Sequence, residues 1–567
     1  MTSKGKLKVV LFWHMHQPEY REPLSGVFQL PWTYLHAIKD YVDMAGHLEA
    51  VPDARAVVNF VPTLLEQIQD YATQVQDSLR EGIPIRDPLL GALNMAALPD
   101  DREHMLLLLK GSLRANEKRL IDRFPAYRRL VDMARWLIAN PHALNYVDEQ
   151  FVADCLVWYH LAWLGETVRR QDLRVKSLMD KSAGYTLRDR RVLLEIIGGL
   201  LAAIPARYRA LGARGQVELS LTPYAHPILP LLIDPSSARE ALPGVELPML
   251  DGYHGGPERA RWHIEQGLAT FERFFGFRPR GCWPSEGGVS RATLELLEEQ
   301  GFHWSATGEQ VLRNSLERGG QAKQAEPEGR VYRPWRLAGR EHRCFFRSDK
   351  LSDLIGFSFA DWHADDAVAH LLAQLERIAG LCPNPEERVV AIVLDGENAW
   401  EHYPENGYHF LSALYRRLAE HPKLETMTFS GCLDAGLPAG ELKTVVAGSW
   451  VYGNFSTWIG DSDKNRGWEM LADAERAYRS ALQAKTLSPE RMQAVSRQLA
   501  VCEGSDWFWW FGDYNPVDSV RDFDRLFRMH LGKLYELLGQ DRPEYLSRPF
   551  THGGGQPEAG GTMRRGA

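Results

Sequence analysis

The sequence predicts an α/β protein built on parallel strands, and three patterns support this. Short apolar segments rich in β-branched residues recur along the chain, and segments with helical periodicity lie between them. The apolar segments lack strict alternation, which is typical of strands buried on both faces of a parallel sheet. Polar or charged residues follow these segments directly. Strand-then-helix order with chemistry at the carboxyl ends of the strands is the pattern of a barrel, although a doubly wound sheet would give the same local pattern.

The expected strands and helices divide the chain into parts. Strands are expected over residues 8–13, 56–60, 217–221, 281–284, 303–306 and 389–394, with helices such as 291–300 and 367–378 between the later ones. Between residues 64 and 213 the periodicity is almost entirely helical, which predicts a helical insertion in the barrel. We therefore expect a catalytic barrel domain over residues 1–435 with this insertion.

The rest of the chain is expected to form a second, helical domain over residues 436–550. A loop rich in glycine and tryptophan spans 448–468, and helical patterns follow over 469–484, 489–501 and 520–538. Residues 551–567 are rich in glycine and have no apolar periodicity, so we expect a disordered tail there.

Composition excludes several classes of protein. A length of 567 residues is too great for one simple core, and a net charge of −8 argues against nucleic acid as a partner. The six cysteines are scattered, with no C-x-x-C pair, so they are expected to be free thiols. The N-terminal apolar run Val9–Trp13 is too short for a signal peptide or a membrane span. We expect a cytoplasmic enzyme without a membrane partner.

Residues 503–513 form the most unusual segment of the chain. Five aromatic residues in a row, 507–511, lie between Asp506 and Asp513. Aromatic faces bordered by carboxylates suit sugar rings, because C–H bonds stack on the π-face while the acids accept hydroxyl hydrogens. Asp506, Trp507 and Trp510 are therefore candidate sugar-binding residues. A buried helix start with an acidic cap is the alternative.

Two further groups of polar residues are candidates for binding. His14 and His16 lie two residues apart at the end of the first strand and share a face, with Gln17 next to them. They could begin a metal site, donate to substrate hydroxyls, or be satisfied surface histidines. Glu218 lies within an apolar strand, where an unpaired carboxylate is costly, and His226 lies on a loop stiffened by prolines. A buried ion pair that only holds the loop is the alternative for both.

Two segments carry the carboxylates on which the functional hypothesis depends. Glu286 follows Trp283-Pro-Ser and precedes two glycines, and Asp395 ends a buried strand two residues before Glu397. Glycoside hydrolysis requires two carboxyl groups from different strands that face one cleft, one of them with a raised pKa. Strand-end acids can also be helix caps. Trp400 lies close by in the chain and is a further candidate for the cleft.

The loop before the C-terminal helices supplies the last candidates. Trp458, Lys464 and Asn465 lie in it, and they could form a rim that binds further sugar units. A loop packed over the helices is the alternative.

Five short segments, taken in order, resemble the conserved regions of glycoside hydrolase family 57. They are the His-Gln-Pro motif at 16–18, segment 215–220, Trp-x-x-Glu at 283–286, Asp-Gly-Glu at 395–397 and the tryptophan-rich helical segment. The resemblance implies an incomplete (β/α)7 barrel with a C-terminal helical domain that contributes to the substrate cleft. It implies a retaining mechanism without metal or cofactor, Glu286 as nucleophile and Asp395 as general acid/base. Residues His14, His16, Glu218, Trp283 and Trp507 match positions that line the cleft.

The motifs look like the amylopullulanase and α-amylase branch of that family. Branching enzymes tend to have leucine where Gln17 stands, and this chain departs from its apparent branch with Tyr514-Asn515 after the aromatic run. We therefore predict an enzyme that hydrolyses α-1,4 linkages of an α-glucan such as glycogen or maltodextrin.

Three alternatives to this prediction remain open. One is 4-α-glucanotransfer by the same fold. Another is a metal-dependent amidohydrolase or deacetylase that uses His14 and His16, with His226 and Asp395 as further ligands. The third is a non-enzymatic glycogen-binding protein.

Overall fold

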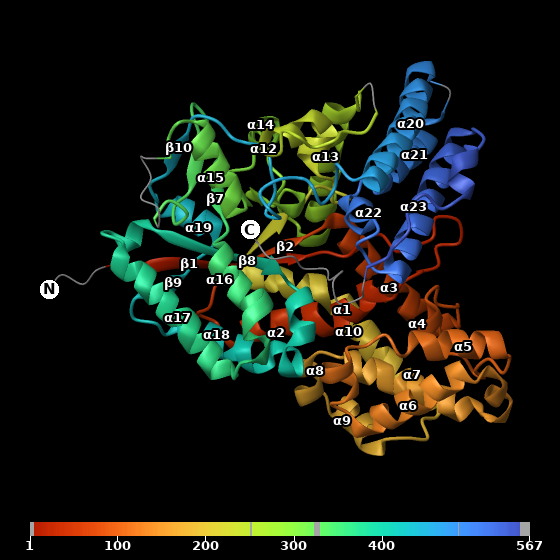
Figure 1. Ribbon diagram of the computed structural model, residues 1–567. Helices are drawn as coiled ribbons and strands as arrows, with labels where there is room; N and C mark the ends of the chain where they lie inside the picture. Colours follow the sequence, from red (N-terminus) through yellow and green to blue (C-terminus); the bar gives the residue numbers. More distant parts are fainter. Residues whose placement is uncertain (1–4, 250–251, 323–328, 486, 556–567) are drawn as a thin grey trace.

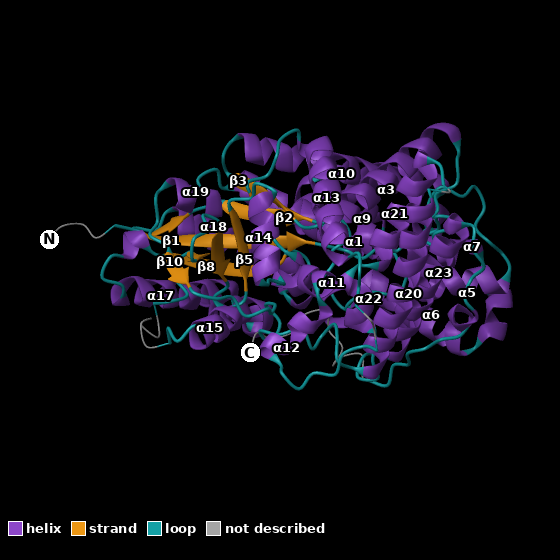
Figure 2. Ribbon diagram, turned by 90° about the horizontal axis from the view of Figure 1, so that it is seen from above, coloured by secondary structure: helices purple, strands orange, loops and turns teal. Residues whose placement is uncertain are grey.

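The protein is described by a computed structural model over residues 5–249, 252–322, 329–485 and 487–555. A curled sheet lies on one side of the molecule, and helices cover its outer face (Figures 1 and 2). The strand order is β10-β6-β7-β5-β4-β3-β2-β1-β8, with β9 paired to the free part of β1. This curled, mostly parallel sheet with surrounding helices confirms the fold class that the sequence predicts.

The sequence order of the strands follows the curve of the sheet. Its parallel strands are β1 (Leu7–Met15), β2 (Ala56–Phe60), β3 (Val217–Leu221), β4 (Gly281–Cys282), β5 (Trp304–Thr307), β7 (Arg343–Phe346) and β8 (Val389–Asp395). Short strands β6 (Trp335–Leu337), β9 (Leu424–Thr426) and β10 (Gly440–Leu442) extend it. The six strands expected from the sequence correspond to β1–β5 and β8, while β6, β7, β9 and β10 were not expected.

The barrel is closed between β7 and β8 by one bridge and a few side-chain contacts. Arg347, directly after β7, forms a parallel bridge with Ala391 of β8. The Arg347 guanidinium donates from Nε to the carbonyl of Val393 over 3.0 Å, and the Val393 amide donates to Oγ of Ser352 over 3.1 Å. Because these contacts replace a continuous ladder, the barrel is incomplete. The curled order with its closing bridge also excludes the doubly wound sheet.

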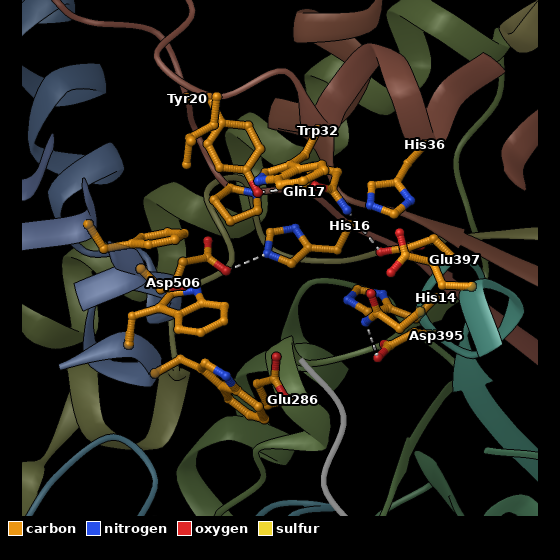
Figure 3. Close-up of a pocket in the computed structure, with 18 of the residues that line it drawn as sticks. His14, His16, Gln17, Tyr20, Trp32, His36, Glu286, Asp395, Glu397 and Asp506 are labelled. Carbon is orange, nitrogen blue, oxygen red and sulfur yellow. Dashed lines mark hydrogen bonds and ion pairs between the residues drawn. The ribbon is translucent and has the colours of Figure 1, made fainter. Parts of the chain in front are cut away.

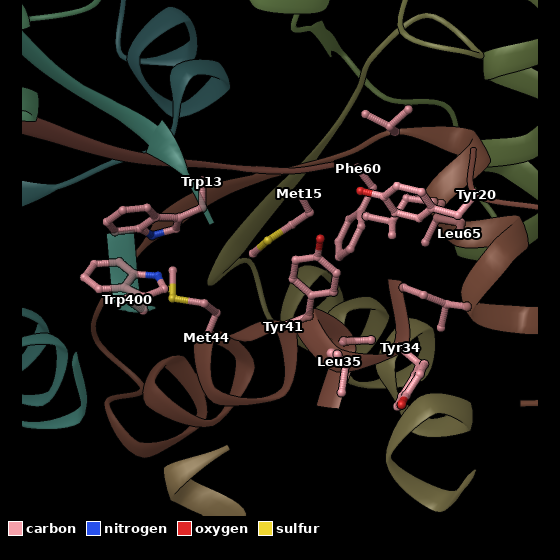
Figure 4. Close-up of a cluster of buried hydrophobic side chains, with 14 of the residues drawn as sticks. Trp13, Met15, Tyr20, Tyr34, Leu35, Tyr41, Met44, Phe60, Leu65 and Trp400 are labelled. Carbon is pink, nitrogen blue, oxygen red and sulfur yellow. The ribbon is translucent and has the colours of Figure 1, made fainter. Parts of the chain in front are cut away.

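Strand β1 has neighbouring strands on both of its edges, and this explains its sequence. All nine of its residues are buried, because β2, β8 and β9 pair with it and helices cover it. Figure 4 shows Trp13 and Met15 of β1 against Met44 and Trp400. The indole of Trp13 donates to the hydroxyl of Tyr415 over 2.7 Å. Burial of side chains of this size stabilises the fold by about 1.5–3 kcal/mol each.

Helices connect the strands and cover them. They are α1 (Trp32–His36), α2 (Val42–Ala50), α11 (Leu229–Ile233), α12 (Ala238–Ala241), α13 (Gly256–Phe275), α14 (Arg291–Glu299), α15 (Glu309–Arg318), α16 (Asp349–Asp353), α17 (Ala364–Leu381), α18 (Tyr408–Ala419) and α19 (Phe429–Asp434). A π-helical turn, η1 (Ala37–Tyr41), joins α1 to α2.

Only helices and turns lie between β2 and β3 in the chain. They include α3 (Pro62–Glu81), α4 (Pro88–Ala92), α5 (Arg102–Gly111), α6 (Pro125–Ala139), α7 (Glu149–Trp163), α8 (Glu166–Gln171), α9 (Leu173–Lys181) and α10 (Leu187–Ala213). The long helix α10 begins with a capping box, in which Thr186 and Asp189 each accept from the other's backbone. Figure 1 shows α4–α9 as a bundle beside the barrel.

The C-terminal part is also helical. It consists of α20 (Ser462–Ala484), α21 (Pro489–Cys502), α22 (Ser505–Trp510) and α23 (Val517–Leu538). A buried ion pair joins α13 to the end of α21, where Arg259 Nη2 contacts Glu503 Oε2 at 2.7 Å. The predicted tail starts at residue 551, but Gly554 and Gly555 donate to the carbonyls of Asp513 and Asn515. Residues 556–567 lie outside the described part.

All six cysteines are buried free thiols, as their scattered positions predict. Within the described residues, every helix is too short or too polar to cross a lipid bilayer.

Candidate active site

A cavity of about 430 Å³ opens at the carboxyl ends of β1, β4 and β8. Eight of the predicted site residues line it: His14, His16, Gln17, Glu286, Asp395, Glu397, Asp506 and Trp510. Figure 3 shows Glu286 and Asp395 on the same side of the cavity, with His16 and Asp506 facing them from above. Residues far apart in the chain therefore meet in one place, as the strand-end argument predicts.

The register of the strands sets the first row of polar groups. His14 of β1 is level with Asp395 of β8 on one side and with Asn59 of β2 on the other. Asn59 is in turn level with Ser220 of β3. Residues at one level of a parallel sheet point to the same face, so the four polar side chains form a row inside the barrel.

Asp395 occupies an environment that favours its protonated form. Burial raises the pKa of Asp395 to about 6, while the side-chain amide of Asn398, His16 and Arg347 act in the opposite direction. The Asn398 Nδ2 donates to Asp395 Oδ2 over 2.8 Å. A carboxyl group with this pKa can hold a proton and release it near neutral pH, which is what a general acid/base needs.

Glu286 lies on a strained turn that directs its side chain into the cavity. It belongs to the single-turn η5 (Ser285–Gly287) after β4, with φ 57° and ψ 24°, a conformation uncommon for a residue other than glycine. The next residue, Gly287, also has a positive φ of 59°, and a Cβ there would lie 3.0 Å from Trp283. The Trp450 indole donates to Glu286 Oε2 over 2.9 Å.

Glu397 and Gln17 line the cavity beside Asp395. Burial raises the pKa of Glu397 well above its usual range, and Asp395 and Asp40 add to the effect. The surroundings of Glu397 therefore favour its protonated form. Gln17 Nε2 contacts Glu397 Oε1 at 3.4 Å, and Tyr20 donates its hydroxyl hydrogen to Gln17 Oε1 over 3.1 Å. Oε2 of Glu397 is buried and has no hydrogen-bond partner among the described residues.

A chain of hydrogen bonds fixes the tautomers of His14 and His226. His14 Nδ1 lies 2.7 Å from the Asn59 carbonyl oxygen Oδ1, which only accepts, so Nδ1 carries the hydrogen. Burial lowers the pKa of both histidines, that of His14 to about 3, so both rings are neutral. Nε2 of His14 must then accept from Nε2 of His226 at 3.1 Å, and Nδ1 of His226 must accept from Ser505 Oγ at 2.8 Å.

His16 joins this cluster to the aromatic segment. Its Nε2 lies 2.8 Å from Oδ1 of Asp506, and its ring stacks on that of His226 with centroids 3.8 Å apart. Ligand atoms of His16, His226 and Asp506 lie within 4.8 Å of one another, a spacing that a metal ion could use. Both nitrogens of His226 are already engaged by His14 and Ser505, however, so a metal would have to break this chain.

Three of the predicted site residues are held in other contacts. Glu218 lies low in β3, where it accepts from the Trp304 indole over 2.7 Å and from the Ser430 amide over 2.9 Å. Glu218 does not line the cavity, and its hydrogen-bond partners are uncharged groups of Trp304 and Ser430. Trp283 is fully buried 6.1 Å from the His14 ring, beneath the cavity. Trp400 is buried against Trp13 and does not line the cavity.

Four predicted residues of the C-terminal part make contacts outside the cavity. Lys464 is fully buried and donates to the carbonyls of residues 508 and 511. Asn465 accepts from the Gly460 amide over 2.9 Å. Trp458 packs against Trp509, and Trp507 points toward the C-terminal helices, where its indole donates to the Val501 carbonyl. None of the four is among the residues that line the cavity. For Trp507 the reason is that the short helix α22 turns only some of its aromatic rings toward the cavity.

Several residues of the cavity wall were not predicted from the sequence. They include Trp32, His36, Arg114, Arg347, Asn398, Trp450 and Trp509. Trp450 and Trp509 lie in segments that the sequence singled out, but nothing in the pattern distinguishes them from their neighbours. Asn515, where this chain departs from the apparent branch, donates from Nδ2 to the carbonyls of Trp509 and Trp510, so it caps α22.

Comparison with known proteins finds a similar sequence among curated proteins. The chain is 22% identical over 358 residues to a 1,4-alpha-glucan branching enzyme of Thermococcus kodakarensis, a match that covers 59% of this chain and 47% of the branching enzyme. It thus matches about half the length of that curated relative.

Solved structures with similar folds cover most of the chain. The crystal structure of that branching enzyme covers 94% of this chain, and this chain covers 90% of it, at 16% identity and a TM-score of 0.55. The alpha-amylase AmyC of Thermotoga maritima aligns over 96% of both chains at 14% identity and a TM-score of 0.56. A 4-alpha-glucanotransferase of Thermococcus litoralis aligns over 94% of this chain and 60% of its own, at 14% identity and a TM-score of 0.51. At these identities the likeness shows the fold alone.

The model of the family described as glycosyl hydrolase family 57 matches residues 10–443, a segment that runs from within β1 to β10 and includes both cavity carboxyls, Glu286 and Asp395. This match extends over well more than half of the sequence. The chain therefore belongs to glycosyl hydrolase family 57.

Proposed function

We propose that this protein is a retaining enzyme that cleaves α-1,4-glucosidic bonds of glycogen or maltodextrins through a covalent glycosyl-enzyme. Glu286 is the nucleophile and Asp395 the general acid/base in this proposal. The observation that carries it is that two carboxyl groups from different strands, β4 and β8, line one cavity in unlike environments. Asp395 is half-buried and has a raised pKa, and Glu286 accepts an indole N–H.

The geometry supports a two-step reaction. In the first step protonated Asp395 gives its hydrogen to the glycosidic oxygen, the bond to the leaving sugar breaks, and Glu286 forms a bond to the anomeric carbon. In the second step ionised Asp395 takes a hydrogen from the incoming hydroxyl group, which displaces Glu286. The Trp450 indole holds the Glu286 carboxylate in place for attack.

The remaining groups of the cavity fit a neutral, hydroxylated ligand. Trp450, Trp509 and Trp510 offer aromatic faces, while Gln17 and Glu397 offer hydrogen-bonding groups. In its protonated form, which burial favours, Glu397 can donate to a sugar hydroxyl as well as accept from one. Oε2 of Glu397 is buried and lacks a partner among the described residues, so a hydrogen bond to the sugar would satisfy it.

Water or a second glucan can complete the reaction. Hydrolysis, of the α-amylase or amylopullulanase type, is our first proposal, since the motifs around Gln17 look like that branch. Transfer to another glucan is the second candidate, because the relatives include a branching enzyme and a 4-alpha-glucanotransferase. Both candidates use the same glycosyl-enzyme, so they differ only in the acceptor.

Incubation of the wild type and Glu286→Gln with maltoheptaose, followed by chromatography of the products, tests the proposal. Shorter sugars only, and none with Glu286→Gln, are expected for a hydrolase. Sugars longer than maltoheptaose would indicate transfer, and new α-1,6 linkages seen by proton NMR would indicate branching. Undiminished turnover by Glu286→Gln would contradict the assignment of the nucleophile.

A further inference from the structure

The cavity has a side wall that the proposed reaction does not use. Trp32 and His36, one helical turn apart on α1, line it together with Gln17 and Glu397. Figure 3 shows His36 reaching toward the cavity between Glu397 and the loop that carries Gln17, with Trp32 beside it. Only 9% of the His36 side chain is exposed, so the part that reaches solvent does so at the cavity.

A buried row of charges fixes the orientation of His36. Its Nδ1 lies 2.8 Å from Oδ2 of Asp40, which is fully buried. Asp40 Oδ1 in turn accepts from Nζ of Lys39 over 2.7 Å, and Lys39 donates to the side chain of Asn406 over 2.9 Å. Lys39 is only 1% exposed. Three buried polar side chains therefore form a hydrogen-bonded row that holds the imidazole at the cavity wall.

The local backbone brings these groups together. Lys39 and Asp40 lie in η1, a π-helical turn directly after His36, and such turns are frequent at functional sites. The next link continues into the helical insertion, because Asn406 Nδ2 donates to Asp43, which accepts from the first amides of α8. The row therefore runs from the cavity to the insertion without a gap.

The partner on Nδ1 decides what His36 offers to a ligand. A carboxylate only accepts, so Nδ1 carries the hydrogen, and Lys39 balances the charge of Asp40. In a neutral ring with its hydrogen on Nδ1, the lone pair is on Nε2, at the opposite edge of the ring. That edge accepts a hydrogen from a hydroxyl group. A cation or a carboxylate at the position of His36 would instead favour a charged ligand.

Aromatic rings enclose this acceptor. Trp163 of α7 meets the His36 ring edge-on at 5.7 Å and the Trp32 ring at 6.0 Å, and Lys39 lies over it at 5.4 Å. The Trp163 indole donates to the carbonyl of Arg114, whose side chain lines the same cavity. Trp32 is only half-buried, so part of its ring remains available in the cavity.

We propose that His36 and the exposed part of Trp32 form a binding subsite for one glucosyl unit of the substrate, apart from the catalytic carboxyls. The Trp32 ring stacks on the sugar, and Nε2 of His36 accepts a hydroxyl hydrogen. Asp40 and Lys39 are positioning residues that hold the His36 ring with Nε2 toward the sugar. This inference rests on the proposed function, because it takes the ligand to be an α-glucan.

Calorimetric titration with maltoheptaose tests the subsite in a Glu286→Gln background, in which the sugar is not consumed. His36→Ala and Trp32→Ala are each expected to weaken binding by about three- to tenfold. His104→Ala and Trp136→Ala are matched controls, because His104 forms an exposed pair with Asp101 and Trp136 is 57% exposed on α6. Both controls are expected to bind like the parent.

Three outcomes are decisive. Equal affinity in His36→Ala, Trp32→Ala and the parent would overturn the subsite and leave the proposed function intact. A parent that binds no maltoheptaose would overturn the proposed function and the subsite with it. Weaker binding in both variants, with unchanged melting curves by circular dichroism, supports the subsite. If His36→Ala fails to fold, His36→Gln, which keeps a polar group at the cavity, and Trp32→Ala take its place.

Discussion

Trp450 holds Glu286 at two points. The indole Nε1 donates to the carboxylate Oε2 over 2.9 Å, and the backbone amide of Trp450 donates to the carbonyl oxygen of Glu286 over 3.1 Å. The second bond supports the left-handed backbone of Glu286, and the first fixes its side chain. A loop from the C-terminal half of the chain thereby orients the proposed nucleophile, which follows β4. Catalysis should therefore depend on residues on both sides of the cavity.

Trp450→Phe is expected to lower kcat/KM on maltoheptaose by about ten- to a hundredfold, because it removes a hydrogen bond to a charged group and keeps a ring in the wall. Steady-state kinetics with Trp136→Phe, an exposed tryptophan on α6, as the control would measure this. A Trp450→Phe enzyme with wild-type kinetics would show that the indole does not position Glu286.

The pH dependence should follow Asp395. Its raised pKa of about 6 means that the proton needed for the first step is lost as the pH rises through that value, so kcat/KM should fall on the alkaline side. Asn398 favours the ionised form, so Asn398→Ala should move this limb to higher pH. A limb that stays in place in Asn398→Ala would mean that another group controls it.

The hydrogen-bonded chain that ends at Ser505 should contribute to stability. Ser505→Ala leaves Nδ1 of His226 buried without its donor, which is expected to lower the free energy of unfolding by about 1–3 kcal/mol. Urea denaturation would measure the difference. Ser505→Thr keeps the hydroxyl and should recover most of the loss, and equal losses in the two variants would count against the hydroxyl as the cause.

The ion pair of Arg259 and Glu503 should be the strongest electrostatic tie between α13 and the C-terminal helices. Glu503→Gln leaves Arg259 buried without a counter-charge, so the free energy of unfolding should fall by about 3–5 kcal/mol. The control is Glu299→Gln. The ion-pair partner of Glu299 is Arg261, which lies on α13 like Arg259 but is exposed. This variant should change stability by about 1 kcal/mol or less.

The same pair should make stability depend on pH. Arg259 and His263 lower the pKa of Glu503 to about 2, against burial, which acts in the opposite direction. The contribution is therefore complete above the ordinary value of 4.5 and is lost as the pH falls toward about 2. The melting temperatures of wild type and Glu503→Gln should converge over that range, and a constant gap would contradict the assignment.

A chelator should leave the activity unchanged. The hydrogen bonds of His226 to His14 and Ser505 compete with any metal held by His16, His226 and Asp506. Activity after dialysis against EDTA, together with metal analysis of the purified protein, checks this. One transition metal per chain, with activity lost on its removal, would favour the amidohydrolase alternative.

The sequence predicts the parts of the fold and site that depend on local pattern. The run of buried residues before His14 and before Asp395 identifies β1 and β8, and their parallel register then brings the two residues level. Strand β7 (Arg343–Phe346) was missed because its apolar run is only three residues long, 344–346, and lies between two arginines. The closing contact of Arg347 depends on that strand and could not be predicted without it.

For the aromatic segment, the sequence could not predict which rings of the helix face the cavity and which face the protein interior. In α22 the rings of Trp507 and Trp510 are three positions apart, yet Trp510 lines the cavity while Trp507 packs against Phe523 and Phe527 of α23. Both faces of this one-turn helix are aromatic, so no apolar stripe distinguishes the buried face. His36 was missed for a related reason, since a lone histidine on a helix has no distinguishing pattern.

The most direct test of the central claim is to trap the glycosyl-enzyme. The wild type would be incubated with a fluorinated α-glucosyl fluoride, which slows the second step, and then analysed by intact-protein and peptide mass spectrometry. The account predicts one added glycosyl group per chain, on the peptide that contains Glu286, and no adduct in Glu286→Gln. An adduct on another residue, or turnover of the reagent in Glu286→Gln, would contradict it.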